Sequence, residues 1–239
     1  MGKNPHYIRL FNKDVNHVNI HYLSETEYLV KDVLVDHIHE RPFCIFDLEG
    51  TGIFVEKEYI TQFGAIIYQN GKILRKFSSL VKSPKLVPER VEQLTGISNE
   101  SLTNAPAFAE AYQQFIDFCG TAVLVTQAGY EYDLPMLHKH CRMSNISLFE
   151  NRVIDTKALF AKLHPELFDV FSTDYLVRHY QIKTNDIKRH DALGDCVLIS
   201  RILDQILMEY KERNIYEFNI KEGLTVKRFA IPAMYLKEE

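Results

Sequence analysis

The 239-residue sequence is informative first for what it lacks. No apolar run approaches the ~20 residues that span a bilayer, and the N-terminus MGKNPHYIRL has no apolar core of a signal peptide. We therefore expect a cytoplasmic protein with no membrane association. The same N-terminus fits the myristoylation pattern poorly, because His6 stands where Ser or Thr is required.

An excess of basic charge is also missing. The chain has 28 Lys and Arg against 32 Asp and Glu, a formal net charge of −4. This balance excludes a strongly basic coat protein for nucleic acid. It does not exclude an enzyme that acts on nucleic acid, because a bound metal and a few local cations can hold a phosphate.

Cysteine is scarce, and none of the four forms a C-x-x-C pair. We interpret Cys44, Cys119, Cys141 and Cys196 as reduced core thiols of an intracellular protein. Residues 1–41 contain five of the ten histidines, but their spacing fits no zinc pattern. That segment is therefore predicted to be a solvated extension or a small added motif.

The hydrophobic pattern predicts one α/β domain over residues 42–210, between an N-terminal extension (1–41) and a C-terminal segment (211–239). Strands are expected at 43–46, 60–69, 72–81, 122–126 and 152–155. Helices are expected at 88–94, 104–119, 133–143, 172–180 and 191–210. Asn70-Gly71 is typical of a two-residue hairpin turn. Ser172 and Asp191 are expected helix caps.

Two acidic residues end the first of these strands. Asp47 and Glu49 are two positions apart, so they point to the same face. Two close carboxylates repel each other unless a positive charge lies between them, and a hard divalent cation such as Mg²⁺ or Mn²⁺ supplies one. The plainer interpretation of such a pair alone is an ordinary solvated strand end.

Further candidates lie downstream. Asp133 begins a helix directly after the fourth expected strand. Asp195 interrupts an apolar helical stretch beside Gly194, which suggests that this helix passes close to the first strand. His190, five residues earlier, falls just outside the helix, where a histidine can act as a general base at neutral pH.

Together these motifs resemble the DEDD-type 3′–5′ exonucleases of the ribonuclease-H-like superfamily, in the subgroup with a catalytic histidine. The matching stretches, in the family's order, are Asp47-Leu48-Glu49-Gly50-Thr51-Gly52, Leu94-Thr95-Gly96-Ile97, Asp133-Leu134-Pro135-Met136-Leu137, Ile154-Asp155-Thr156 and His190-Asp191-Ala192-Leu193-Gly194-Asp195. The resemblance covers about Phe43 to Met208. Several motifs in the right order are far more specific than any one of them.

The resemblance implies a three-layer fold with a mixed five-stranded sheet flanked by helices. It also implies hydrolysis of single-stranded DNA or RNA from the 3′ end to nucleoside 5′-monophosphates. Two Mg²⁺ or Mn²⁺ ions would be held by Asp47, Glu49, Asp133 and Asp195, with His190 as general base. The implied contacts to the terminal nucleotide come from the backbone around Leu48, Gly50 and Thr51, and from Leu94.

One departure from the family pattern concerns the stretch before Asp133. The proofreading subunits of bacterial DNA polymerases usually have His-Asn-Ala there, whereas this chain has Gln127-Ala128-Gly129-Tyr130-Glu131-Tyr132. The aromatic directly before Asp133 is more similar to exonucleases that trim histone-mRNA and small-RNA ends. Glu131 could take the place of Asp133, which we prefer because Leu134 and Leu137 follow it. The choice between DNA and RNA stays open.

Residues around these motifs have two interpretations each. Tyr130 and Tyr132 are core residues or base-stacking platforms. A second group either touches phosphate or forms a solvated edge: Lys82, Lys85 and Arg90. Asp155 is expected to cap the next helix, and His138 and His140 are expected to be surface or packing residues.

Three other functions were weighed against the exonuclease. A catalytically silent protein with the exonuclease fold, serving binding or regulation, would need no metal-dependent turnover. A ribonuclease-H-like endonuclease would tolerate a blocked 3′ end. A nucleotide-binding Rossmann or P-loop protein is disfavoured, because the sequence has no G-x-x-x-x-G-K-[ST] motif. A protein partner could dock on residues 1–41 or 211–239.

Overall fold

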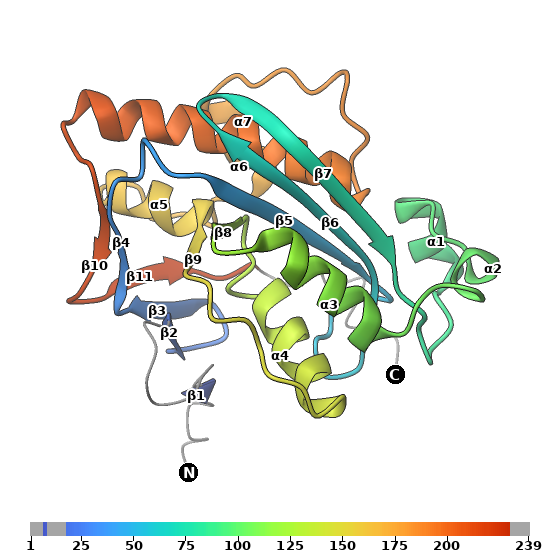
Figure 1. Ribbon diagram of the computed structural model, residues 1–239. Coiled ribbons are helices and arrows are strands. Elements are labelled where there is room, and N and C mark those ends of the chain that lie inside the picture. Colours follow the sequence, from blue (N-terminus) through green and yellow to red (C-terminus); the bar gives the residue numbers. More distant parts are fainter. Residues whose placement is uncertain (1–6, 9–17, 230–239) are drawn as a thin grey trace, which may run out of the picture.

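The computed structural model describes residues 7–8 and 18–229, and at its centre is a five-stranded sheet (Figure 1). The strand order is β7-β6-β5-β8-β9. Their bounds in that order are Lys72–Leu80, Ile60–Gln69, Phe43–Gly50, Val123–Thr126 and Val153–Asp155. Strand β5 pairs antiparallel with β6 and parallel with β8, so the sheet is mixed, as the sequence predicted.

The hairpin between β6 and β7 follows from its turn residues. Gln69 pairs with Lys72, which leaves Asn70 and Gly71 as the two turn residues. Their φ angles are 51° and 75°, both in the left-handed region that this turn requires. The predicted two-residue hairpin is therefore confirmed.

The predicted helices lie close to their expected positions, whereas α2 was not predicted and α5 was expected only through its cap at Asp155. Their bounds are Glu89–Thr95 (α1), Asn99–Leu102 (α2), Phe108–Cys119 (α3), Asp133–Met143 (α4), Thr156–Leu163 (α5), Thr173–His179 (α6) and Ala192–Glu212 (α7). The side chains of Asp155, Ser172 and Asp191 accept the N-cap hydrogen bonds of α5, α6 and α7, which confirms those three caps.

One expected helix is shorter than predicted. The sequence indicated a helix from residue 104, but α3 begins at Phe108. Pro106 disfavours the helical conformation at Ala105, and Ala107 is still extended with ψ 156°. The chain therefore makes the separate short helix α2 first and then turns into α3.

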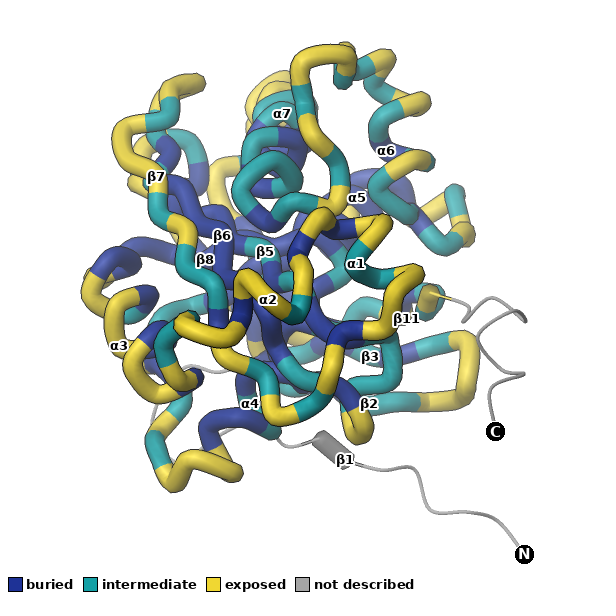
Figure 2. The backbone as a smooth tube through the Cα atoms, turned by 90° about the vertical axis from the view of Figure 1, so that its right-hand side faces the viewer, coloured by how far each residue is buried: buried dark blue, intermediate teal, exposed yellow. Residues whose placement is uncertain are grey.

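Helices cover both faces of the sheet, and neighbouring residues of β6 identify the two faces. The ring of Phe63 stacks on Phe115 of α3 with centroids 5.2 Å apart. On the opposite face, a Cβ at Gly64 would lie 2.3 Å from the carbonyl carbon of Ala192 in α7. The sheet is thus the middle of three layers; its strands β5, β6 and β8 are largely buried, whereas the edge strand β7 is exposed or half-buried (Figure 2).

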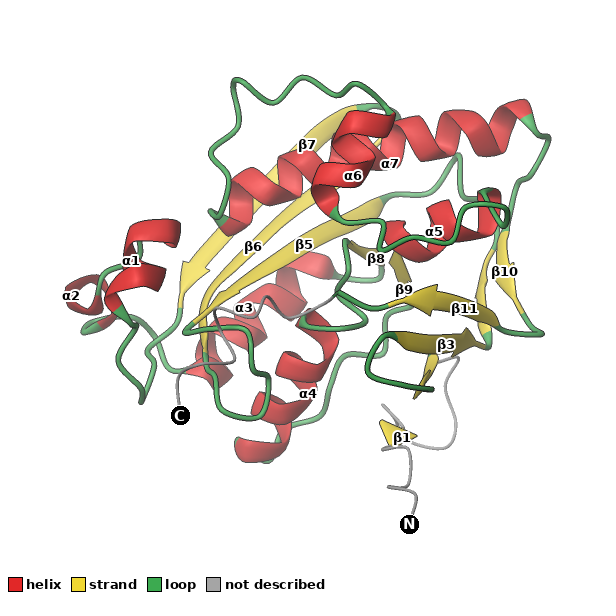
Figure 3. Ribbon diagram, turned by 180° about the vertical axis from the view of Figure 1, so that it is seen from behind, coloured by secondary structure: helices red, strands yellow, loops and turns green. Residues whose placement is uncertain are grey.

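The two ends of the chain form strands that the sequence analysis did not predict. These are β1 (Tyr7–Ile8), β2 (Asn19–Tyr22), β3 (Glu27–Lys31), β4 (Val33–Val35), β10 (Phe218–Ile220) and β11 (Leu224–Lys227). One sheet has the order β1-β2-β3-β11, and β10 pairs with β4 (Figures 1 and 3). Strands β1, β2 and β3 pair in succession, whereas β11 pairs with β3 and β10 with β4, so the pairings of β10 and β11 join segments from opposite ends of the chain.

The main hydrophobic core includes these added strands. It runs from Val18 through the central sheet to Val226, so residues of β2, β3, β4, β10 and β11 pack on the same core as the central sheet. All four cysteines are buried and free, as expected of core thiols. Within the described part of the chain, no helix is both long and apolar enough to cross a membrane.

Candidate active site

Three carboxylates from two layers meet at one end of β5. Asp47 and Glu49 lie opposite Gly64 and Gln62 of β6, and Asp195 lies in the first turn of α7. One carboxylate oxygen from each lies within 4.8 Å of the other two. The structure therefore brings together residues that are separated by almost 150 positions in sequence.

The approach of α7 to the sheet depends on a missing side chain. Gly64 pairs with Asp47 across the strands, and the backbone of Ala192 occupies the space that a Cβ at Gly64 would need. The prediction that Gly194 permits this close approach is wrong. A Cβ at Gly194 would lie 2.1 Å from the carbonyl oxygen of Lys188, so Gly194 accommodates the preceding loop and not the strand.

The electrostatics of the cluster are unfavourable to three negative charges. Burial and the nearby charges of Asp133, Glu49 and Asp195 raise the pKa of Asp47 well above its ordinary value. Burial, together with Asp195 and Asp133, raises the pKa of Glu49 to about 8. Burial also raises the pKa of Asp195, although Arg189 counteracts it. Such a site favours a proton or a cation.

Asp133 lies beside this cluster without joining its closest contacts. It is buried at the start of α4 and accepts a 2.5 Å hydrogen bond from the hydroxyl of Thr126. Burial raises the pKa of Asp133 to about 7, while the bond from Thr126 lowers it. Its charge is the largest electrostatic influence on Asp47.

The neighbouring acid, Glu131, is engaged elsewhere. Its carboxylate is paired with the buried ammonium of Lys157 and accepts the backbone N–H of Phe229 at 2.5 Å. Asp155 accepts backbone N–H groups of Ala128 and Tyr130 at 3.0 and 3.1 Å, so it holds the same loop in addition to capping α5. The geometry therefore favours Asp133 over Glu131 as the acid that faces the cluster.

His190 lies on the loop that leads into α7. Its φ is 57°, in the left-handed region, and its side chain is exposed. Its backbone N–H donates to Asp195 at 2.7 Å, which ties the loop to the carboxylate cluster. Sequence reasoning missed the residue before it: the guanidinium of Arg189 contacts Asp195 at 2.9 Å. A basic residue directly before the histidine motif was the available signal.

The expected nucleotide-contacting residues have different environments. Leu48 and Gly50 are buried, whereas Leu94 of α1 is 47% exposed. Thr51 is also buried, and its backbone N–H already donates to the carbonyl of Tyr59 at 2.9 Å. Its hydroxyl donates to Glu58. Leu94 is thus the member of this set with an open apolar side chain.

The two tyrosines of the loop before α4 are mainly structural. Tyr130 is fully buried and donates to the carbonyl of Val153 at 2.9 Å, so the stacking interpretation is wrong for it. Tyr132 is half-buried and donates to the carbonyl of Gly52 at 2.8 Å. It therefore connects the loop that holds Asp133 with the segment after β5.

The remaining candidates are also either engaged in structural contacts or open to solvent. His140 is buried, and burial lowers its pKa to about 4, as expected of a packing residue. His138 is half-buried on the same helix. Lys85 donates to both oxygens of Glu58 at 2.8 and 2.7 Å, which leaves it no free charge for a phosphate, whereas Lys82 is exposed.

Comparisons with known proteins agree with this arrangement. The RNase T family, described as Exonuclease, matches residues 44–203. DNA polymerase III subunit epsilon of Aquifex aeolicus (strain VF5) is 32% identical over 193 residues, which are 81% of this chain and 92% of that protein. DNA polymerase III PolC-type of Latilactobacillus sakei subsp. sakei (strain 23K) is 27% identical over 211 residues, 87% of this chain but only 14% of that protein.

Solved structures show the same fold. The nuclease domain of 3′hExo, a DEDDh family member bound to rAMP, has a TM-score of 0.63 at 20% identity and covers 72% of this chain and 94% of that one. Exonuclease X in complex with 5′ overhanging duplex DNA has a TM-score of 0.56 at 18% identity, covering 70% and 91%. On the family match and the relative from Aquifex aeolicus, this chain belongs to the exonuclease family and is a hydrolytic exonuclease.

Proposed function

We propose that the protein is a metal-dependent 3′–5′ exonuclease that hydrolyses the 3′ ends of single-stranded nucleic acid to nucleoside 5′-monophosphates. The observation that carries the proposal is the convergence of Asp47, Glu49 and Asp195, whose oxygens lie within 4.8 Å of one another. Their pKa values are raised although Arg189 contacts Asp195, so the negative charge of the cluster is only partly compensated.

The donor set fits hard divalent cations. Carboxylate oxygens are the ligands that Mg²⁺ and Mn²⁺ prefer, and three of them converge here with Asp133 beside them. When bound, such ions would activate water and stabilise the leaving 3′ oxygen. Asp47, Glu49 and Asp195 would hold them, and Asp133 would act directly or through a water molecule.

His190 is proposed as the general base. It is exposed at the entrance to α7, and its backbone is tied to Asp195 at 2.7 Å, so its position is coupled to the carboxylate cluster. A neutral imidazole there can accept the proton of the attacking water. Cations held by the carboxylate cluster, rather than a basic protein surface, would then compensate the negative charge of the phosphate substrate.

Substrate contacts are proposed at the segment after Asp47 and at α1. Leu94 offers an exposed apolar side chain to the terminal nucleotide, and the backbone of Leu48, Gly50 and Thr51 borders the carboxylates. The names of the relatives and neighbours include DNA polymerase subunits, an exonuclease in complex with DNA and a nuclease domain bound to rAMP. We therefore propose a single-stranded 3′ end as substrate and let the assay distinguish DNA from RNA.

The proposed activity is assigned to one part of the chain. Residues 42–210 would carry the exonuclease activity, with residues 1–41 and 211–239 as flanking segments. A protein partner would dock on these flanking segments, whose strands β3 and β11 pair with each other.

The test compares matched single-stranded DNA and RNA labelled at the 3′ or the 5′ end, with Mg²⁺, with Mn²⁺ and with EDTA. We expect mononucleotides from the 3′ end only with metal, and none from the Asp47→Ala variant. Release of internal fragments from a substrate with a blocked 3′ end would indicate an endonuclease instead. Tight binding of the labelled strand without any release would favour the catalytically silent binding protein.

A further inference from the structure

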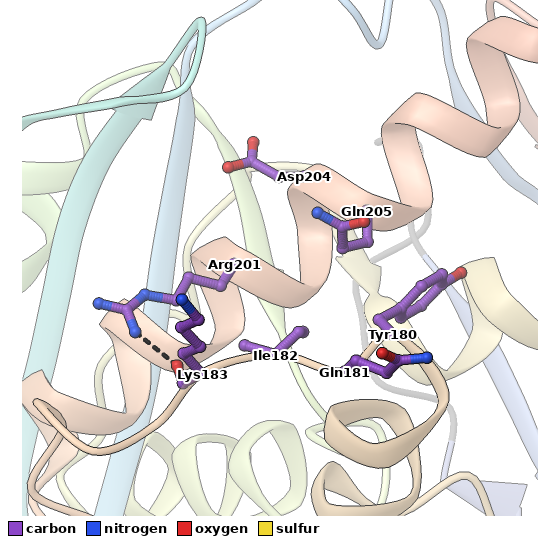
Figure 4. A pocket seen from close by; sticks show the side chains of 7 residues that line it. All are labelled: Tyr180, Gln181, Ile182, Lys183, Arg201, Asp204 and Gln205. Atoms are coloured by element: carbon purple, nitrogen blue, oxygen red, sulfur yellow. Dashed lines mark hydrogen bonds between the residues drawn. The ribbon is translucent and has the colours of Figure 1, made fainter.

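The loop between α6 and α7 contains His190, and an arginine forms hydrogen bonds near each end of this loop. At the far end, Arg201 of α7 donates to the carbonyl oxygen of Lys183 at 2.6 Å, as Figure 4 shows. It also donates to both carboxylate oxygens of Asp186 at 2.9 and 2.5 Å. This end borders a hollow of about 400 Å³ between the loop and α7, well away from the carboxylate cluster.

The other end is held by Arg189, which contacts two carboxylates at once. Its Nε donates to Asp195 Oδ1 at 2.9 Å, and its Nη1 donates to Asp174 Oδ1 of α6 at 3.0 Å. Asp174 is exposed, whereas Asp195 is half-buried and belongs to the proposed metal ligands. Arg189 therefore connects the cluster with a helix that takes no part in it.

Both oxygens of Asp195 are engaged by this short segment. Arg189 occupies Oδ1, and the backbone N–H of His190 occupies Oδ2 at 2.7 Å. His190 also has a φ of 57°, which a non-glycine residue adopts at a cost and keeps only where its surroundings hold it. The geometry of the loop at His190 thus depends on the charge and position of Arg189.

We propose that Arg189 is a positioning residue for the exonuclease reaction: it anchors the His190 loop on Asp174 and competes with the metal for Asp195. This inference rests on the proposed function. In the metal-free protein the guanidinium supplies the positive charge beside Asp195. Cation binding at Asp195 must weaken that contact, and Asp174 then retains Arg189, so that the loop and His190 keep their place.

The proposal predicts opposite changes in two quantities. In Arg189→Ala, Asp195 loses a competing positive charge, so Mn²⁺ should bind about 3- to 10-fold more tightly. The loop also loses its anchor, so kcat should fall about 10- to 100-fold. A residue with only a structural role would not tighten metal binding.

Two further variants separate anchoring from charge. Asp174→Asn removes the anchor but leaves Arg189 committed to Asp195, so kcat should fall and Mn²⁺ affinity should fall slightly as well. Arg189→Lys keeps the charge but loses the planar fork that reaches both carboxylates. We expect near-parent Mn²⁺ affinity and a kcat between those of the parent and Arg189→Ala.

The experiment measures Mn²⁺ binding by calorimetry on the full chain without nucleic acid, and kcat and KM on a 3′-labelled oligonucleotide at saturating Mn²⁺. Arg201→Ala is the matched control, because it breaks an arginine–aspartate pair on the same loop without touching Asp195. Its Mn²⁺ affinity should equal that of the parent.

Unchanged or weaker Mn²⁺ binding in Arg189→Ala, alongside a kcat loss no larger than that of Arg201→Ala, would overturn the proposal. If Arg189→Ala does not fold, as judged by circular dichroism, then Arg189→Lys and Asp174→Asn decide the question. If the parent releases no nucleotide, the proposed function fails, while the calorimetric comparison still tests the competition for Asp195.

Discussion

Replacing Glu49 by Gln should stabilise the metal-free protein, although it removes a proposed metal ligand. Burial and the charges of Asp195 and Asp133 raise the pKa of Glu49 from 4.5 to about 8. Between these two pH values the folded protein keeps a proton that the unfolded chain has released. The carboxyl group therefore costs stability progressively as the pH rises from 4.5 to 8.

The size of this effect follows from the shift. At ~1.4 kcal/mol per pKa unit, the full difference is at most about 5 kcal/mol. Glu49 is only half-buried and shares its repulsion with Asp47 and Asp195, so a single neutral replacement should recover only part of it. We expect about 1–2 kcal/mol, which for a chain of this length raises Tm by about 2–8 °C.

The assay is thermal unfolding in EDTA at pH 8 and at pH 4. Glu49→Gln should unfold at a higher temperature than the parent at pH 8, and the difference should vanish at pH 4, where the carboxyl group is protonated in both states. Excess Mn²⁺ at pH 8 should stabilise the parent more than the variant, because the variant has lost a ligand.

The matched control is Glu58→Gln. Glu58 is a carboxylate even more buried than Glu49, but it is compensated by Lys85 at 2.8 and 2.7 Å and by the hydroxyl of Thr51. The same substitution there should lower Tm, since it leaves the ammonium without its partner. If Glu49→Gln lowers Tm in EDTA at pH 8 as Glu58→Gln does, the reasoning about an uncompensated cluster is refuted.

Three other substitutions test the site from different directions. Asp47→Ala should abolish nucleotide release and Mn²⁺ binding while the far-ultraviolet circular dichroism stays that of the parent; retained turnover would contradict its role. His190→Ala should slow single-turnover release by ~10²–10⁴-fold with Mn²⁺ binding unchanged in calorimetry, and equal rates would eliminate it as the base. Gly64→Ala places a Cβ 2.3 Å from Ala192, so it should cost ~1–3 kcal/mol in denaturant unfolding and weaken Mn²⁺ binding by displacing α7; unchanged affinity would show that the approach of α7 does not depend on Gly64.

Much of the fold was predictable because its signals are local. The turn at Asn70 and Gly71 and the caps at Ser172 and Asp191 depend on residues within a few positions of one another. The pairing of strands from the two ends of the chain was not predictable, because it joins segments that are far apart in sequence. Strand β3 is paired with β2 on one side and with β11 on the other, and β11 lies almost 200 residues away in sequence.

The candidate site shows the same division. The sequence alone predicts which acids could act together, because the period of a strand places Asp47 and Glu49 on one face and the motif order singles out Asp133, His190 and Asp195. It also contains the overall negative charge that led us to propose a cation at the phosphate.

Which of these groups meet, and which charges compensate them, depends on tertiary packing. Gly64 lets α7 approach the sheet, and Lys157 forms an ion pair with Glu131, which directs that carboxylate away from the cluster. Arg189 contacts both Asp195 and Asp174. Each of these is a contact between distant segments. A sequence pattern reports the period of one element, whereas charge compensation depends on distances between elements, and these are set by how closely their backbones pack.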